Sequence, residues 1–510
     1  MTRYAMKQPQ LQAVAVFLSR AIQPEWVFIV LALIGGVASA LFVPAGAGLD
    51  EPSHIARVEQ IVHGGMLPQK LQKSTIDSEW SSIPDSDFDL YGGETDAALV
   101  ETSVGNMRSM HTSKQVYAYP TWNDPNISSD AQVGGARKIP FVFSNSAINS
   151  PVVYVPQGVG FAIGRLFTSN AYALIIAMRI MAVLFYAISL FVCIRLAPFG
   201  RWVLASIALI PNNILTNAMV SADTVTFVAA TALIVSVLRA VSRETITTAQ
   251  WVVIAGSSFV LALSKITYIP FLVALAALPL SKEKIERKAI YVRVIGIWLV
   301  CFVVWLLWYM QIHHINTGAM FKSGVDPHAQ MQFIMSHPIG FIKIAISNLL
   351  GTDYLSVHSM GILTGHGSFA YAGSITMILL IMSILCDSTM VGSSARNSSV
   401  KPFAWLLAIC IPVIIILIEV AVYTQFMPVG STVTDGVQER YFLPLIFPTL
   451  LFGLIFTLPE PSDSAFSEVR QQRSSWMTVL FQFMALGVLL LQLGWTLFGI
   501  SPVQWGLRGM

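Results

Sequence analysis

The sequence predicts an all-α integral membrane protein with about eleven transmembrane helices and a long first extracytoplasmic loop that carries juxtamembrane helices. The chain has 510 residues, of which 55% are hydrophobic and 11% are charged. Its mean hydropathy of +0.67 lies outside the range of soluble globular proteins. Apolar runs recur from end to end, and a helix of about 20 residues crosses the hydrocarbon core with its backbone polar groups satisfied internally.

The individual spans are predicted from these apolar runs. They cover residues 25–43, 172–194, 201–217, 224–241, 250–264, 268–280, 290–311, 369–386, 402–423, 441–457 and 476–499. The runs 250–264 and 268–280 are short, so they form either one bent pair or a re-entrant hairpin. The first run contains Ala38-Ser39-Ala40, which imitates a signal-peptidase site, but it continues apolar beyond that point. We therefore expect a retained first span, with cleavage as the alternative.

Basic residues predict the orientation, because short cytoplasmic loops retain Lys and Arg. With the amino terminus inside, every cytoplasmic segment is basic; these segments carry Arg3, Lys7, Arg20, Arg195, Arg201, Arg239, Arg243, Lys282, Lys284, Arg287, Lys288, Arg293, Arg396, Lys401, Arg470 and Arg473. The predicted organisation is a cytoplasmic amino terminus (1–24), a transmembrane module (25–311) with an extracytoplasmic loop (44–171), a second such loop (312–368), and carboxy-terminal helices (369–510). The expected location is a bacterial plasma membrane.

The two long outer loops are expected to hold helices on the membrane surface. In the first loop, residues 51–64 have helical spacing of apolar side chains, and residues 152–166 are apolar again after Pro151. In the second loop, residues 328–335 and 339–350 form a similar pair. No internal repeat or heptad is evident, so an inverted-repeat transporter gains no support.

Several function classes lack support in the composition. The net charge of +3 is small and scattered, which argues against a nucleic-acid partner. The four cysteines lie in or beside apolar runs without metal-ligand spacing, so they are interpreted as small hydrophobic residues rather than as a disulfide or zinc site. There is no Gly-rich phosphate loop, nucleophile elbow or zinc-protease motif.

The strongest local motif is Asp50-Glu51-Pro52-Ser53-His54, directly after the first span. Two carboxylates and an imidazole at an apolar boundary are costly to desolvate unless they are paired, protonated or ligated. One interpretation is a helix cap, because Pro52 suits a first helical turn. The other makes a carboxylate the general base for an acceptor hydroxyl. Asp50 or Glu51 with His54 could also hold Mg²⁺ or Mn²⁺.

Four further charged residues are candidates for the same outer pocket. Asp223 in Ser221-Ala222-Asp223 is either a cap of the next span or a second site carboxylate. Arg179 lies inside an apolar span, where it pairs with Asp223 or another acid or faces a polar cavity. Lys265 and Arg440 lie at outer helix ends, where such side chains either extend toward the interface or together clamp a phosphate.

At these residues the chain resembles a large family of polytopic bacterial membrane proteins that is catalogued as a domain of unknown function and is similar to the GT-C glycosyltransferases. The matching elements cover most of the chain: residues 50–54, residues 151–165 with Tyr154, Pro156 and Gln157, Arg179, Pro211, residues 221–223, Lys265 with Tyr268 and Pro270, residues 330–338 and residues 438–444.

The resemblance implies a GT-C-like plan in which an acid near the end of the first span serves as catalytic base or metal ligand. It implies Asp50 as the base, with Glu51 as its neighbour or alternative, and a polyprenyl-phosphate sugar as donor. Asp223 is expected as a further catalytic carboxylate because it lies on the same side of the membrane. The residues expected to bind substrate are His54, Tyr154, Gln157, Arg179, Lys265, Tyr268, Gln438, Arg440 and Tyr441. One departure is Glu439, which stands where a small residue is expected before Arg440.

The primary hypothesis is transfer of a sugar from a lipid-phosphate donor to a cell-envelope glycan at the extracytoplasmic face, with membrane lipids as further partners. A flippase or transporter of lipid-linked glycans is one rival, and it predicts polar residues near mid-membrane. A non-catalytic scaffold for envelope assembly is another, and it predicts tolerance to loss of Asp50.

Overall fold

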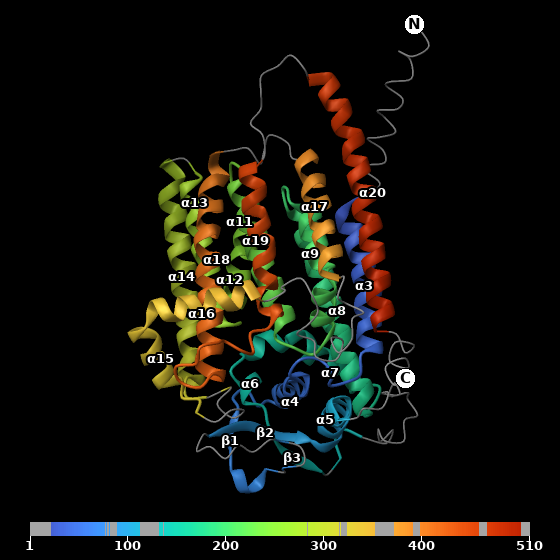
Figure 1. Ribbon diagram of the computed structural model, residues 1–510, viewed down its shortest axis with the longest axis vertical. Helices are drawn as coiled ribbons and strands as arrows, with labels where there is room; N and C mark the ends of the chain where they lie inside the picture. Colours follow the sequence, from blue (N-terminus) through green and yellow to red (C-terminus); the bar gives the residue numbers. More distant parts are fainter. Residues whose placement is uncertain are drawn as a thin grey trace.

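The computed structural model describes residues 22–76, 78, 81, 89–112, 132–135, 137–282, 284–315, 317, 324–351, 372–390, 398–457 and 467–500. A bundle of long helices forms the upper part of the molecule in Figure 1, and a layer of short helices with a small sheet lies below it. The predicted basic residues Arg3, Lys7, Arg20 and Arg396 lie outside the described residues.

Seven helical segments are long and apolar enough to cross a membrane. They are α3 (Pro24–Phe42), α8 (Ala171–Leu196), α11 (Asp223–Val241), α14 (Lys284–Ile312), α18 (Lys401–Phe426), η7 (Glu439–Phe442) continued by α19 (Leu443–Thr457), and α20 (Ser467–Gly499). The multi-span helical architecture is thus confirmed for the described part of the chain. The count of eleven is not confirmed, because the other four predicted spans are shorter or broken helices.

These shorter elements follow the predicted segments. They are α9 (Arg201–Ala208), α10 (Pro211–Ala218), α12 (Thr248–Ala262), η3 (Ile266–Ala276), α13 (Ala277–Leu280) and α17 (Ala372–Met390). A short turn of helix, η6 (Ser398–Val400), directly precedes α18. The predicted span 201–217 is broken because Pro211 begins a new helix: proline lacks the amide hydrogen that would continue α9, and its fixed φ suits a first helical position.

Helices are present at the predicted positions in both loops. In the first loop they are α4 (Glu51–Val62) and η2 (Pro151–Tyr154) with α7 (Val155–Gly164). In the second loop, α15 (Pro327–Ser336) and α16 (Pro338–Gly351) meet at a bend of 106°. If this pair is one broken span, the number of candidate spans rises to eight.

The lower layer also contains a sheet that the sequence analysis did not predict. Strands β1 (Gln69–Leu71), β2 (Leu90–Asp96) and β3 (Lys138–Val142) pair antiparallel in that order, accompanied by η1 (Lys73–Thr75), α5 (Ala97–Thr112) and α6 (Ser144–Ala147). Gly92 in β2 lies opposite Val142. A Cβ at Gly92 would lie 2.0 Å from the Phe141 carbonyl oxygen, so this close strand contact requires glycine.

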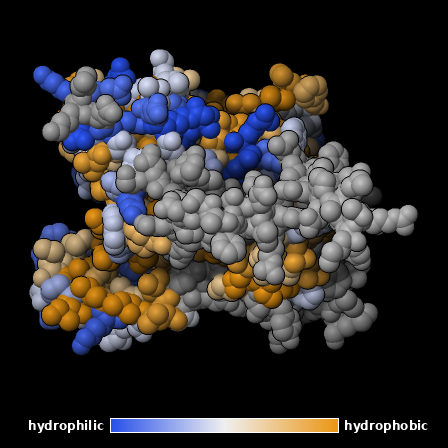
Figure 2. Space-filling view, turned by 90° about the horizontal axis from the view of Figure 1, so that it is seen from above, coloured by the Kyte–Doolittle hydropathy of each residue, from blue (hydrophilic) through white to orange (hydrophobic). Residues whose placement is uncertain are grey.

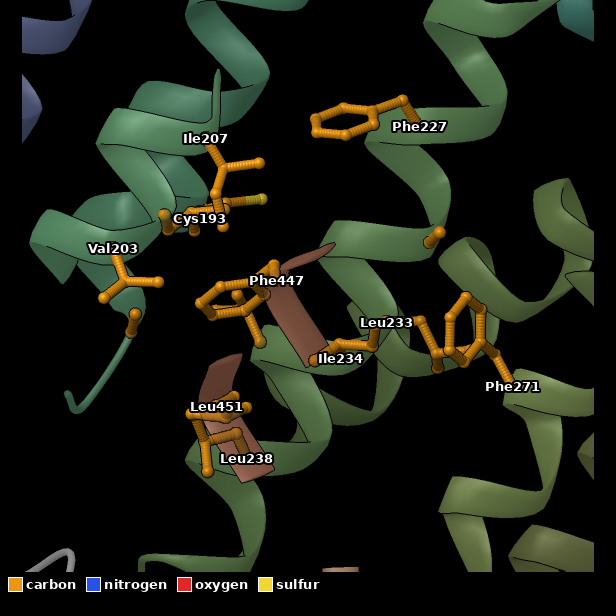
Figure 3. Packing of buried hydrophobic residues seen from close by; sticks show 14 of the residues in the cluster. Cys193, Val203, Ile207, Phe227, Leu233, Ile234, Leu238, Phe271, Phe447 and Leu451 are labelled. Atoms are coloured by element: carbon orange, nitrogen blue, oxygen red, sulfur yellow. The ribbon is translucent and has the colours of Figure 1, made fainter. Parts of the chain in front are cut away.

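The main hydrophobic core lies within the bundle. Figure 3 shows Phe447 and Leu451 of α19 among side chains of α9 and α11, including Val203 and Leu238. Phe447 is only 2% exposed, and such a well-filled contact fixes α19, and the segment that precedes it, against the neighbouring helices. The four cysteines are free and buried, as expected for small hydrophobic residues.

Basic side chains secure the upper end of the bundle in Figure 1. Arg201 forms an ion pair of 2.7 Å with Glu25 at the start of α3. Lys282 donates to the Ala240 carbonyl oxygen over 2.9 Å, and Arg239 donates to the Leu196 carbonyl oxygen over 2.8 Å. These contacts place several predicted cytoplasmic segments at one end. Seen from this end, hydrophilic side chains gather along one edge (Figure 2).

Candidate functional site

Asp50 has the most unusual backbone among the candidate residues. Its φ of 57° and ψ of 13° place it in the left-handed region, and no other described non-glycine residue has a positive φ. It occupies the position before α4, yet its side chain caps no helix amide. The carboxylate instead accepts a 2.9 Å hydrogen bond from Arg440 Nη2. The cap interpretation of Asp50 is therefore wrong, and the turn directs its carboxylate toward Arg440.

Four charged side chains from distant parts of the chain meet here, and we call Asp50, Asp223, Lys265 and Arg440 the charged cluster. Arg440 bridges the two acids, since its Nη1 lies 3.2 Å from Asp223 Oδ2. Lys265 Nζ pairs with the other Asp223 oxygen. Both cations also lie over the ring of Tyr441, at 4.8 Å from Lys265 Nζ and 5.4 Å from Arg440 Cζ to its centroid.

The cluster is closed on one side and open on the other. The side chain of Arg440 is 5% exposed and that of Asp223 is 12% exposed, whereas Lys265 reaches 23% and Asp50 reaches 41%. A buried guanidinium is costly to desolvate unless its charge is paired, and the two carboxylates supply that pairing. Asp50 is thus the acid of the cluster that a molecule from outside reaches most easily.

The surrounding chain fixes the position of Arg440. Its Nε donates to Gln438 Oε1 over 2.6 Å, and its Nη1 donates to the Leu49 carbonyl oxygen over 3.3 Å. The Tyr268 hydroxyl donates to the Tyr441 carbonyl oxygen over 2.7 Å. These bonds tie the turn before α19 to η3 and to the turn before α4.

His54 lies one turn into α4, beside the cluster. Its Nδ1 is 2.7 Å from the Tyr154 hydroxyl, which also accepts from Asn149 Nδ2 at 3.3 Å. Burial lowers the pKa of His54 from 6.5 to about 4, and Arg440 acts in the same direction, against the opposing effect of Asp50. His54 is therefore neutral at physiological pH. Sequence reasoning missed Asn149, although it lies two positions before Pro151, where a matching segment starts.

Glu51 and Arg179 form a separate, closed ion pair. Arg179 Nε and Nη2 donate to the two oxygens of Glu51 over 2.8 and 2.6 Å, and both side chains are 0% exposed. The remaining Arg179 donors bind the carbonyl oxygens of Ala40, Val43 and Pro44. Burial alone would raise the pKa of Glu51, but Arg179 reverses this and lowers it.

The Glu51 carboxylate is also bound by backbone amides. Its Oε2 accepts from Gly46 and Gly48 over 3.0 and 3.1 Å, and its Oε1 accepts from Val220 over 3.0 Å. The pair therefore joins the end of α3, the middle of α8 and the turn before α11. Sequence analysis left the partner of Arg179 open between Asp223 and another acid, and that partner is Glu51.

Two further polar residues shape the turn that holds Asp223. The fully buried Gln157 donates from Nε2 to the Ser221 carbonyl oxygen over 2.9 Å. Ser221 Oγ accepts from the Asp223 amide over 3.2 Å. Ala222 occupies the position before α11 and makes no side-chain cap hydrogen bond. Asp223 is the first residue of α11 and does not cap it; its carboxylate faces Lys265 and Arg440.

The predicted metal ligands Asp50, Glu51 and His54 do not make a metal centre. Glu51 is fully engaged with Arg179 and backbone amides, and His54 directs Nδ1 to Tyr154. Within the described ranges, no three His, Cys, Asp or Glu side chains are grouped closely enough to hold a metal ion. We therefore correct this expectation and derive no chemistry through Mg²⁺ or Mn²⁺.

These features define a multi-pass α-helical membrane protein with a charged cluster at one end of its bundle. The chain belongs to the predicted membrane protein family DUF2142, whose family model matches residues 33–449. The matched segment includes every residue of the charged cluster, the Glu51–Arg179 pair and His54. No curated protein and no solved structure matches the chain.

Proposed function

We propose that the protein is a GT-C-type glycosyltransferase that moves a sugar from a polyprenyl-phosphate carrier to a cell-envelope glycan at the extracytoplasmic face. The observation that carries the proposal is the position of Asp50: its carboxylate is 41% exposed, yet it contacts the nearly buried guanidinium of Arg440. A reachable carboxylate beside fixed cations suits a reaction in which a proton is removed while a phosphate leaves.

The proposed reaction uses the cluster in two roles. An Asp50 oxygen takes the proton of an acceptor hydroxyl, and that hydroxyl oxygen forms the new bond to the anomeric carbon of the donor sugar. The bond between this carbon and the phosphate oxygen breaks, and its electron pair leaves with the lipid phosphate. Arg440 and Lys265 stabilise the departing phosphate. They give up part of their contact with the carboxylates and contact the phosphate oxygens in its place.

The remaining site residues are assigned by their contacts. Asp223 holds Lys265 and Arg440 in place before the phosphate arrives. Neutral His54 offers a hydrogen bond to a sugar hydroxyl, with its ring oriented by Tyr154. Gln157, Tyr268, Gln438 and Tyr441 position these groups through the bonds described above. Because Glu51 and Arg179 are fully enclosed, we assign them to positioning the end of α3 rather than to base catalysis or phosphate binding.

The positions of the basic residues support one orientation of the chain in the membrane. Arg201, Arg239 and Lys282 bind partners at the end of the bundle where α3 begins, and the charged cluster lies at the opposite end, where α11 begins (Figure 1). With the basic end in the cytoplasm, the cluster and the lower layer face the exterior of a bacterial plasma membrane. This location at one end, rather than at mid-membrane, favours the transferase over the flippase.

The direct experiment replaces Asp50 with Asn in the full-length chain and measures envelope glycan composition in the producing cells. Loss of the sugar addition, with unchanged protein abundance and melting temperature, is the expected result. Asp50→Glu keeps a base and is expected to retain part of the activity. Asp89→Asn is the matched control, because Asp89 is 48% exposed and pairs with Lys70 away from the cluster. Wild-type glycan in Asp50→Asn cells would refute base catalysis and would favour the scaffold.

A further inference from the structure

A groove of about 530 Å³ lies between α12 and α14, toward the upper end of the bundle and away from the charged cluster. It begins at Thr248, at the first turn of α12, and extends past Ala255 and Gly296 to Phe259. Thr248 and Phe259 are eleven positions apart, so the groove runs about 16 Å along α12. Its walls are mostly apolar side chains, and it lies outside the helices that hold Asp50 and Asp223.

One cation lies in this groove near its upper end. Arg293 of α14 stacks over the ring of Trp251, with Cζ 5.3 Å from the ring centroid. Among the described residues, no acidic side chain lies within ion-pair distance of Arg293. The first turn of α12 adds the positive end of a helix dipole, so the Arg293 charge and this dipole both favour a negative charge at this point.

The groove lies beside the exposed apolar face of α14. Only 17% of the apolar window of α14 is buried within the protein. Val292 and Leu299 on this helix are 65% and 61% exposed, which is expected for side chains in contact with acyl chains. The space beside Gly296 is open, since a Cβ built there would meet no atom within 4 Å.

We propose that this groove binds one anionic phospholipid, with the phosphate on Arg293 and an acyl chain lying past Gly296 toward Phe259. The charge of Arg293 selects a negative headgroup, and the apolar floor accommodates the chain. A basic pocket between spans at a bundle end is a suitable recognition site for a lipid phosphate. The site is independent of the sugar-transfer proposal, because the groove and the charged cluster share no residue.

The experiment measures lipid retention by native mass spectrometry of the purified full-length protein, with phosphatidylglycerol and phosphatidylcholine as the two probes. The wild type is expected to retain one phosphatidylglycerol in preference to phosphatidylcholine. Arg293→Gln is expected to lower phosphatidylglycerol retention about fivefold. Gly296→Leu is expected to abolish it by filling the groove, without a clash against neighbouring atoms.

Two matched variants control for general charge and bulk. Lys288→Gln removes an exposed cation of α14 that does not line the groove. Gly256→Leu adds the same side chain at an α12 position that is equally open but outside the groove. Both are expected to retain phosphatidylglycerol at the wild-type level. Equal retention of the two lipids by the wild type, or unchanged phosphatidylglycerol retention in Gly296→Leu, would overturn the proposal.

Discussion

Arg179 and Glu51, 128 positions apart in the chain, bind each other through two parallel hydrogen bonds of 2.8 and 2.6 Å inside the protein. All the donors of the guanidinium are used, and the carboxylate accepts three backbone amides as well. A pair of this kind places the turn that carries Asp50 directly against α8, so the geometry of the charged cluster depends on it.

Removal of one partner of this pair is expected to destabilise the end of the molecule that holds the charged cluster. Glu51→Gln or Arg179→Met leaves the other group buried without its counter-charge, which costs about 3–5 kcal/mol of folding free energy. The measurement is thermal unfolding of the detergent-solubilised protein. Lys70→Met, which breaks an exposed ion pair with Asp89, is the control and is expected to cost less than about 1 kcal/mol. Equal melting temperatures for Glu51→Gln and Lys70→Met would contradict this interpretation.

Because Asp50 has a left-handed backbone, two substitutions distinguish the effect of backbone strain from the effect of losing the carboxylate charge. Asp50→Ala and Asp50→Gly both remove the carboxylate, but only glycine adopts a φ of 57° without a Cβ penalty. We expect the glycine variant to be the more stable of the two by about 1 kcal/mol. Glycan assays on both variants should nevertheless show the same loss of activity. Higher stability of Asp50→Ala would indicate that this turn relaxes in solution.

The extent of sequence-based prediction differs between the bundle and the site. Apolar runs locate the spans because a hydrocarbon environment selects for them independently of neighbours. The break before Pro211 and the sheet around Gly92 depend on local backbone contacts that hydropathy does not record. The motif residues could be chosen for their charge at an apolar boundary. Their partners could not, because only packing decides that Arg179 binds Glu51 while Arg440 binds Asp50.

Protonation of His54 is expected to make the fold sensitive to acid. Burial lowers its pKa in the folded protein from 6.5 to about 4, so the unfolded chain binds a proton more readily between these values. The stabilisation is complete above pH 6.5 and falls as the pH drops toward 4, by up to about 3 kcal/mol. Melting temperatures across this range measure the effect.

The matched variants for this prediction lie on one helix. His54→Gln removes the titrating group beside Tyr154 and should flatten the pH dependence between 6.5 and 4. His63→Gln changes an exposed histidine at the end of α4 and should leave the dependence as in the wild type. If the His54→Gln profile keeps the full slope, another group is responsible for the acid sensitivity.

Gly160 allows α7 to approach α8 closely, and this contact supports both Tyr154 and Gln157. A Cβ at Gly160 would lie 2.5 Å from the Ala177 carbonyl oxygen and 2.9 Å from the Met178 Cα, both in the backbone of α8. Neither atom can move without displacing that helix. Gly160→Ala is therefore expected to lose about 1–3 kcal/mol of folding free energy through overpacking, measured by thermal unfolding.

Gly158 is the matched control, because it lies in the same helix and a Cβ there would meet its nearest neighbour, Val62 Cγ2, at an ordinary 3.5 Å. Gly158→Ala should be neutral or stabilising by up to about 1 kcal/mol, since alanine has the higher helix propensity. A shift of α7 should also move Gln157 from the Ser221 carbonyl, so Gly160→Ala should reduce glycan transfer even at temperatures where the protein stays folded. Equal stability of the two alanine variants would show that α7 and α8 are less closely packed than their glycine contact implies.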